Sequence, residues 1–186
     1  SGYSITKFGA EMEVWRASQE GIDVVIVNPG IILGAGFWNV GSGKFFSKIY
    51  NGLKYYTEGI TGFVGVKDVV KTMIFLTNST IKNERFILVS ENKSYKEIFF
   101  LIADAFDKKR PYKKVYRWQM EILWRVSSFL SIVTRKEPLL SKYAAKSANS
   151  ISWYTSKKIK KTLPFKFQTI EEVVNDVSEN YPRGAF

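Results

Sequence analysis

The sequence predicts an α/β protein built on a parallel sheet. Residues 3–19 have apolar side chains at helical spacing, and residues 22–27 form a short, nearly unbroken apolar run. Such a run is typical of a parallel strand that is covered on both faces. A turn rich in glycine and proline follows at residues 28–36. Open α/β sheets bind their ligands at this position, beyond the carboxyl end of a strand.

The first predicted helix carries a tyrosine and a lysine four residues apart, Tyr3 and Lys7. Residues at this spacing lie one turn apart on the same face of a helix. A neighbouring cation lowers the pKa of a tyrosine phenol from its ordinary value of about 10, which makes the phenol a usable acid or base. The pair is therefore a candidate catalytic device. The alternative is a chance spacing on an ordinary helix.

The same periodicity predicts which way the first helix faces. Phe8, Met12 and Trp15 form one apolar stripe, and Lys7, Glu11 and Glu13 are expected to face water.

Further elements follow in chain order. We expect helices at residues 44–51, 69–76, 94–106 and 118–134, and strands at residues 53–57, 63–66 and 85–89. In the helix at 44–51, Phe45, Phe46 and Ile49 should face inward. Asp68 is expected to cap the helix at 69–76. Ser94 with Glu97, and Thr169 with Glu172, have the spacing of capping boxes at two helix starts.

Four stretches in order resemble a known enzyme superfamily. They are YSITK-F-x-x-E followed by GIDVVIVNPGIILGAG, GFVGVKDVVKTMIFL (62–76), RFILVSENKSYKEIFFLIADAF (85–106) and WYTSKKIKKTLPFKFQTIEEVV (153–174). Together they are similar to the extended short-chain dehydrogenase/reductases, the NAD-dependent epimerase/dehydratase group, and most closely to its dihydroflavonol-reductase-like members. The family's N-terminal glycine-rich phosphate loop is not in this sequence. The chain is therefore expected to correspond to the C-terminal portion of such an enzyme.

The resemblance implies a division of the chain. Residues 1–36 would be the catalytic helix and a late strand of a Rossmann-type parallel sheet. Residues 37–186 would form mainly a smaller mixed α/β substrate lobe, with residues 62–92 returning to the sheet.

The resemblance also implies a reaction. The complete protein would transfer a hydride between NAD or NADP and a carbonyl or alcohol carbon, with Tyr3 as general acid/base and Lys7 holding the cofactor ribose. The backbone that borders the nicotinamide would be Asn28, Pro29, Gly30, Ile31 and Ile32. A nucleotide-sugar epimerase or dehydratase is the close alternative, because it uses the same Tyr/Lys pair. A fragment that binds a membrane or a partner is the alternative of another class. By itself, the present chain is expected to be inactive.

The amino-acid composition excludes some kinds of functional site and partner. The 186 residues contain no cysteine and no histidine, so zinc sites and histidine-based triads are excluded, and no metal ligands are expected. The net charge is +11, with basic runs at residues 107–114 and 157–161. We interpret these runs as solvated faces, because no nucleic-acid-binding motif accompanies them. The expected partner is a small molecule, either hydrophobic or a nucleotide sugar. A homodimer is left open, and the expected location is the cytoplasm.

Residues 118–134 are expected to form a helix rich in aromatic residues. It is too polar to span a membrane, so two interpretations remain. It can close the substrate lobe, burying Trp118, Ile122, Phe129 and Val133, or it can lie on a membrane surface with its apolar stripe exposed. The lobe is the preferred interpretation, because large exposed apolar patches are uncommon on soluble monomers.

Overall fold

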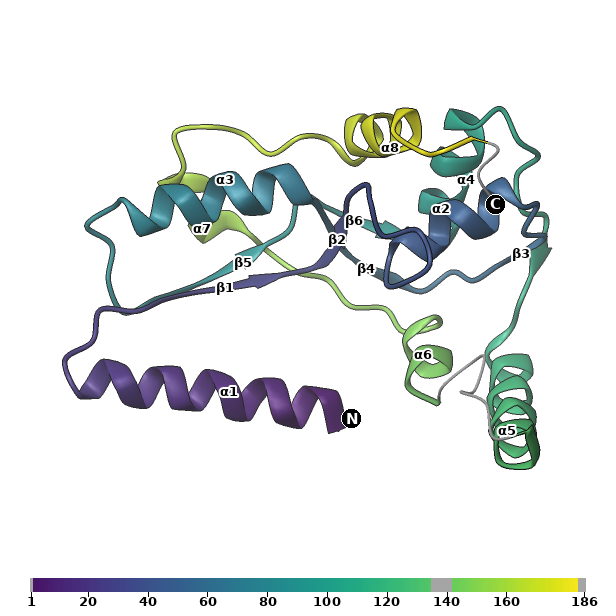
Figure 1. Ribbon diagram of the computed structural model, residues 1–186, viewed down its shortest axis with the longest axis horizontal. Coiled ribbons are helices and arrows are strands. Elements are labelled where there is room, and N and C mark those ends of the chain that lie inside the picture. The colour runs from purple at the N-terminus through teal and green to yellow at the C-terminus, as the bar shows by residue number, and fades with distance from the viewer. Residues whose placement is uncertain (1, 135–141, 184–186) are drawn as a thin grey trace.

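The computed structural model describes residues 2–134 and 142–183, without the side chains of Tyr3, Ile132, Val133 and Tyr143. It has the predicted mixed α/β fold with parallel strand pairing. Figure 1 shows an elongated molecule with a strand pair at one end and a helical cluster at the other.

The strands form three short sheets. β1 (Val25–Pro29) pairs in parallel with β5 (Glu84–Leu88). β2 (Ile31–Leu33) pairs in parallel with β4 (Ile60–Gly65), and β4 pairs antiparallel with β6 (Glu91–Ser94). β3 (Tyr55–Tyr56) pairs in parallel with β7 (Lys113–Lys114). The strand predicted at residues 22–27 therefore begins three residues later, and Asn28 and Pro29 belong to it.

Helices lie on both sides of the β1–β5 pair. Figure 1 shows α1 (Gly2–Gln19) on one side, and α3 (Val66–Thr77) with α7 (Lys157–Thr162) on the other. At the opposite end, α2 (Gly43–Tyr50), α4 (Tyr95–Ala105) and α8 (Ile170–Glu179) lie close together. The helix predicted at residues 118–134 is present as α5 (Arg117–Thr134), and it packs against α6 (Lys142–Ser147).

Two apolar cores hold these layers together. The larger lies among α2, α4, α8 and β4, and the smaller lies among α3, α7 and β5. Burial contributes about 1.5 to 3 kcal/mol for each large apolar side chain. Phe46 and Ile49 are buried in the larger core as predicted, and Phe45 packs against it. This core keeps α2 and α4 fixed beside the sheet.

Both predicted capping boxes are present. The Ser94 hydroxyl accepts a hydrogen bond from the Glu97 backbone N–H at the start of α4, and Thr169 does the same with Glu172 at α8. The cap predicted for Asp68 is wrong. Gly65 is the N-cap of α3, whereas Asp68 lies within the first turn, 1% exposed. Its Oδ2 accepts a hydrogen bond of 2.8 Å from the backbone N–H of Gln168, so Asp68 links α3 to the segment before α8.

The predicted facing of two helices is also wrong. On α1, Phe8 is 63% and Met12 42% exposed. On α5, the side chains of Trp118, Ile122 and Phe129 are exposed instead of buried, and that of Val133 lies outside the described residues. Within residues 2–134 and 142–183, no helix is long and apolar enough to cross a membrane.

Candidate functional site

A cleft of about 1180 Å³ lies at the carboxyl ends of β1 and β5. Four of the five residues predicted to border a cofactor line it: Asn28, Pro29, Gly30 and Ile31. Ile32 does not line the cleft, and its backbone carbonyl accepts a hydrogen bond from the Ser42 hydroxyl. Residues 28–31 are therefore a wall of the cleft, although they belong mostly to the end of β1 and the start of β2 and do not form the predicted turn.

Gly30 allows this wall to approach the sheet closely. Its backbone N–H donates to the carbonyl of Leu88 at 3.0 Å, which continues the β1–β5 pairing. A Cβ at this position would lie 2.4 Å from the carbonyl oxygen of Gly62 on β4, much closer than van der Waals contact. Only glycine therefore fits here without displacing the backbone of the cleft.

Glu11 ties α1 to the cleft. Its Oε1 accepts a hydrogen bond of 2.8 Å from Arg85 Nη1 on β5, and its Oε2 accepts one of 3.2 Å from Asn28 Nδ2 on β1. The prediction that Glu11 faces water is wrong, because its side chain is only 16% exposed. Arg85, as the main cause, and the hydrogen bonds from Asn28 and Trp15 hold the pKa of Glu11 below its ordinary value, against the opposing effect of desolvation.

Tyr3, Lys7 and Glu11 follow one another at intervals of four residues on α1. They therefore occupy successive turns of one helix face. The Tyr3 side chain lies outside the described part of the structure, and Lys7 is exposed and does not line the cleft. The interval from Lys7 to Glu11 places Glu11 on the same helix face as the candidate pair, but it does not indicate the partners of Glu11 on β1 and β5.

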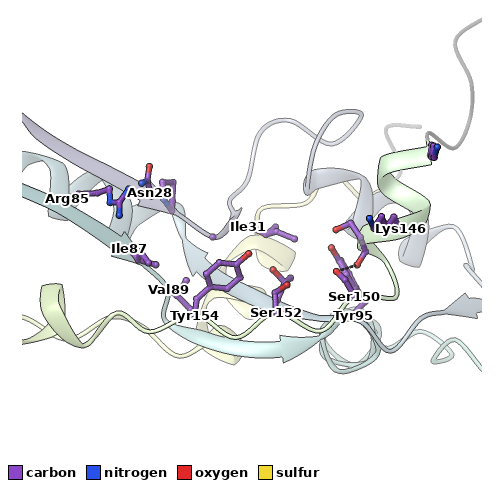
Figure 2. Close-up of a pocket in the computed structure, with 15 residues that line it drawn as sticks. Asn28, Ile31, Arg85, Ile87, Val89, Tyr95, Lys146, Ser150, Ser152 and Tyr154 are labelled. Atoms are coloured by element: carbon purple, nitrogen blue, oxygen red, sulfur yellow. Dashed lines mark hydrogen bonds between the residues drawn. The ribbon is translucent and has the colours of Figure 1, made fainter. Parts of the chain in front are cut away.

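The opposite wall of the cleft comes from residues that the sequence did not single out. Figure 2 shows Tyr154 and Ser152 between Arg85 at one end and Lys146 of α6 at the other. The Asn92 side chain fixes the backbone of Tyr154, because its Nδ2 donates to the Tyr154 carbonyl at 2.8 Å and its Oδ1 accepts from the Tyr154 N–H at 2.9 Å. No local pattern marks this wall, since Asn92 and Tyr154 are far apart in the sequence.

A second cavity, of about 1270 Å³, adjoins the cleft, and we call it the apolar groove. Tyr95 and Ser147 line both spaces. Most of its other lining residues are aromatic or aliphatic and come from α2, β3, α4 and α5, including Phe45, Leu53, Tyr56, Phe99, Ile122 and Leu123. A molecule in the cleft could therefore extend an apolar portion into the groove.

Comparisons with known proteins support the predicted resemblance. Residues 1–76 match the model of an NAD-binding family described as male sterility protein. No curated protein matches the chain.

Solved structures match over nearly the whole chain. The crystal structure of gox2253 has a TM-score of 0.76 at 23% identity, covering 96% of this chain and 55% of that one. PA4631, a nucleoside-diphosphate-sugar epimerase from Pseudomonas aeruginosa, has a TM-score of 0.73 at 16% identity, covering 97% of this chain and 55% of that one. The dTDP-glucose 4,6-dehydratase from Bacillus anthracis in complex with NAD has a TM-score of 0.71 at 12% identity, covering 99% of this chain and 53% of that one. The chain thus has the fold of about half of each of these proteins, and the Rossmann-type fold class is confirmed.

Proposed function

Starting from this shared fold, we propose that the chain is part of an NAD(P)-dependent oxidoreductase that acts on a carbonyl or alcohol carbon of a small molecule. The observation that carries the proposal is the double hydrogen bond of Glu11 to Asn28 and Arg85. It fixes the helix of Tyr3 and Lys7 against β1 and β5, and Asn28 lies at the carboxyl end of its strand, where α/β sheets bind ligands.

The residues of the cleft fit the nicotinamide end of the cofactor. The wall formed by residues 28–31 has no charged side chain, whereas Arg85 and Lys146 supply cations farther along. The bound nicotinamide would donate or accept the hydride. The family's glycine-rich phosphate loop is not in this sequence, so these residues would hold only part of the cofactor.

The proton transfer is assigned to the face of α1. In the reducing direction the Tyr3 phenol would donate its proton to the substrate oxygen, and in the oxidising direction it would accept one. Lys7, one turn away, would stabilise the phenolate by its charge and hold the cofactor ribose. Glu11 would not contact the reacting atoms. Its role would be to hold α1 in place beside Asn28.

The apolar groove supports a substrate with a hydrophobic portion. Its lining includes three cations, Lys48, Lys113 and Lys114, but most of its lining residues are aromatic or aliphatic. The second candidate is a nucleotide-sugar epimerase or dehydratase. It is favoured by the similarity to PA4631 and to the dehydratase, and by the cations of the cleft, which suit a diphosphate.

A substrate panel separates the two candidates. The complete natural gene product is incubated with NADPH or NADH and either hydrophobic aldehydes and ketones or UDP-glucose and dTDP-glucose. We expect oxidation of the nicotinamide with the apolar carbonyl compounds. Conversion of the nucleotide sugars alone would overturn the first candidate in favour of the second, and no turnover of either class would contradict both.

A further inference from the structure

The apolar side of α5 is largely exposed, although Trp118, Ile122 and Leu123 also line the apolar groove. Trp118, Ile122, Val126 and Phe129 lie at spacings of four, four and three residues, so they form one stripe along the helix. Two leucines widen the stripe. Each of the six side chains is at least half exposed, and we call them the apolar face of α5: Trp118, Ile122, Leu123, Val126, Phe129 and Leu130.

The partly buried side of α5 is more polar. Ser127, Ser128 and Ser131 are only partly exposed, and α5 packs against α6. Trp124 also lies on this side, with the Lys142 ammonium of α6 5.4 Å from its ring centre. A helix that served only to close a soluble lobe would bury its apolar stripe. The exposure of this stripe calls for an apolar partner outside the described residues.

The segment before α5 is strongly basic and aromatic. Residues 108–117, which lead into α5, contain six Lys or Arg and no acidic residue. Lysines lie over tyrosine rings here, with Lys109 Nζ 5.1 Å from the ring centre of Tyr112 and Lys114 Nζ 5.3 Å from that of Tyr116. Both tyrosines are more than half exposed. Exposed aromatic rings with lysines beside them are typical of proteins at the headgroup layer of a membrane.

We propose that the apolar face of α5 and the basic segment at residues 108–117 dock the protein onto the surface of an anionic lipid bilayer. The apolar side chains would enter the boundary between headgroups and acyl chains, while the basic residues would contact the anionic headgroups. Charge complementarity selects this occupant over a second copy of the chain, because two copies with net charge +11 would bring like charges together. The proposal is independent of the proposed function.

A bilayer in this position has a consequence for the apolar groove. Trp118, Ile122 and Leu123 belong both to the apolar face and to the lining of the groove. The mouth of the groove would therefore open at the membrane surface.

Vesicle sedimentation tests the proposal with the 186-residue chain. The chain is mixed with vesicles of phosphatidylcholine alone or with added phosphatidylserine, at low and at physiological ionic strength. We expect binding to the anionic vesicles at both ionic strengths, with partial weakening by salt, and little binding to the neutral ones. Absence of binding to anionic vesicles would overturn the proposal.

Matched variants identify the surface. Ile122→Ser/Phe129→Ser changes the apolar face, and Val70→Ser/Ile74→Ser changes equally exposed residues of α3. Lys109→Glu/Lys113→Glu changes the basic segment, and Lys157→Glu/Lys161→Glu makes the same charge change on α7. Circular dichroism checks that each variant is folded. We expect Ile122→Ser/Phe129→Ser and Lys109→Glu/Lys113→Glu each to weaken binding to anionic vesicles about tenfold or more. The α3 control should leave binding near wild type.

Two results would contradict the assignment. Equal losses in the α5 and α3 variants, or in the two charge variants, would show that binding is not directed by this surface. A concentration-dependent dimer without lipid that Ile122→Ser/Phe129→Ser abolishes, with no vesicle binding, would identify a second copy as the occupant.

Discussion

Glu11 of α1 accepts a hydrogen bond of 2.8 Å from Arg85 of β5, across 74 positions of sequence. The same carboxylate accepts from Asn28 at the end of β1. The apolar side chains Phe8 and Met12 of α1 are exposed, so this polar connection holds the helix where hydrophobic packing does not. The carboxylate of Glu11 therefore helps to fix the helix that carries the candidate catalytic pair.

Glu11→Gln should lower the free energy of unfolding in a pH-dependent way. The pKa of Glu11 is lowered in the folded state, mainly by Arg85. A lowered carboxyl pKa stabilises the fold above the unfolded value of about 4.3, and this stabilisation is lost as pH falls through the folded value. The difference from wild type should be about 1 kcal/mol or less at pH 7, because Arg85 is more than half exposed.

Urea unfolding at a series of pH values measures this difference. Glu13→Gln is the control, since Glu13 forms an exposed pair with Arg16 on the same helix, and it should change little. A Glu11→Gln difference that grows as pH falls below about 4 would contradict the account.

Asp68 should show the opposite pH dependence. Burial, the main cause, raises its pKa, although the hydrogen bond from Gln168 opposes the shift. The stability contributed by a raised carboxyl pKa is fully present below the unfolded value of about 3.9 and is lost as pH rises through the folded value. Asp68→Asn should therefore gain stability relative to wild type across that window.

Asp104 provides a control of opposite sign. Its pKa is lowered, mainly by the hydrogen bond from Arg110, so Asp104→Asn should lose stability relative to wild type as pH rises above the folded pKa. Thermal unfolding of both variants at several pH values gives the two slopes. Slopes of the same sign would show that burial does not dominate at Asp68.

The sequence predicted contacts between residues that are close in the chain, but not contacts between residues that are far apart in it. The capping boxes at Ser94 and Thr169 are local, with both partners within three residues, and both predictions are confirmed. The roles of Glu11 and Asp68 depend on Arg85 and Gln168, which are distant in the sequence. No periodicity contains that information, so both side chains were predicted incorrectly.

The candidate site divides in the same way. Asn28 to Ile31 were predicted from the turn that follows an apolar strand, and they line the cleft. Tyr154 lines it from a segment with no strand or helix signal, held by Asn92. On α5, periodicity predicted the apolar stripe, but the direction of the stripe depends on how α5 packs on α6.

Gly30→Ala should destabilise the chain. The added Cβ would lie 2.4 Å from the Gly62 carbonyl oxygen, and relieving such an overlap typically costs about 1 to 3 kcal/mol. Gly9→Ala is the matched control, because nothing lies within 4 Å of its Cβ position on α1, and alanine favours a helix over glycine by up to about 1 kcal/mol. Chemical denaturation should show a loss for Gly30→Ala and a gain for Gly9→Ala. Equal stability of the two variants would refute the close approach.

The 186-residue chain should bind nicotinamide cofactors weakly. The cleft offers the wall at Asn28 to Ile31 and three cations, Arg85, Lys142 and Lys146, but the sequence has no glycine-rich loop of the family's spacing to hold the pyrophosphate. Titration with NADH and NADPH, followed by fluorescence or calorimetry, should give no micromolar dissociation constant. Tight binding of either cofactor would mean that this cleft holds the cofactor by itself.

The proposed reaction rests on Tyr3 and Lys7, and steady-state kinetics of the complete natural gene product tests it most directly. Lys7→Met should impair both turnover and cofactor affinity. Tyr3→Phe removes only the phenolic hydroxyl, and we expect it to lower kcat by about 10² or more, the range that proton-transfer catalysis supplies, with KM for the cofactor near wild type. A Tyr3→Phe protein with near-wild-type kcat on the natural substrate would contradict the assignment of Tyr3 as the general acid/base.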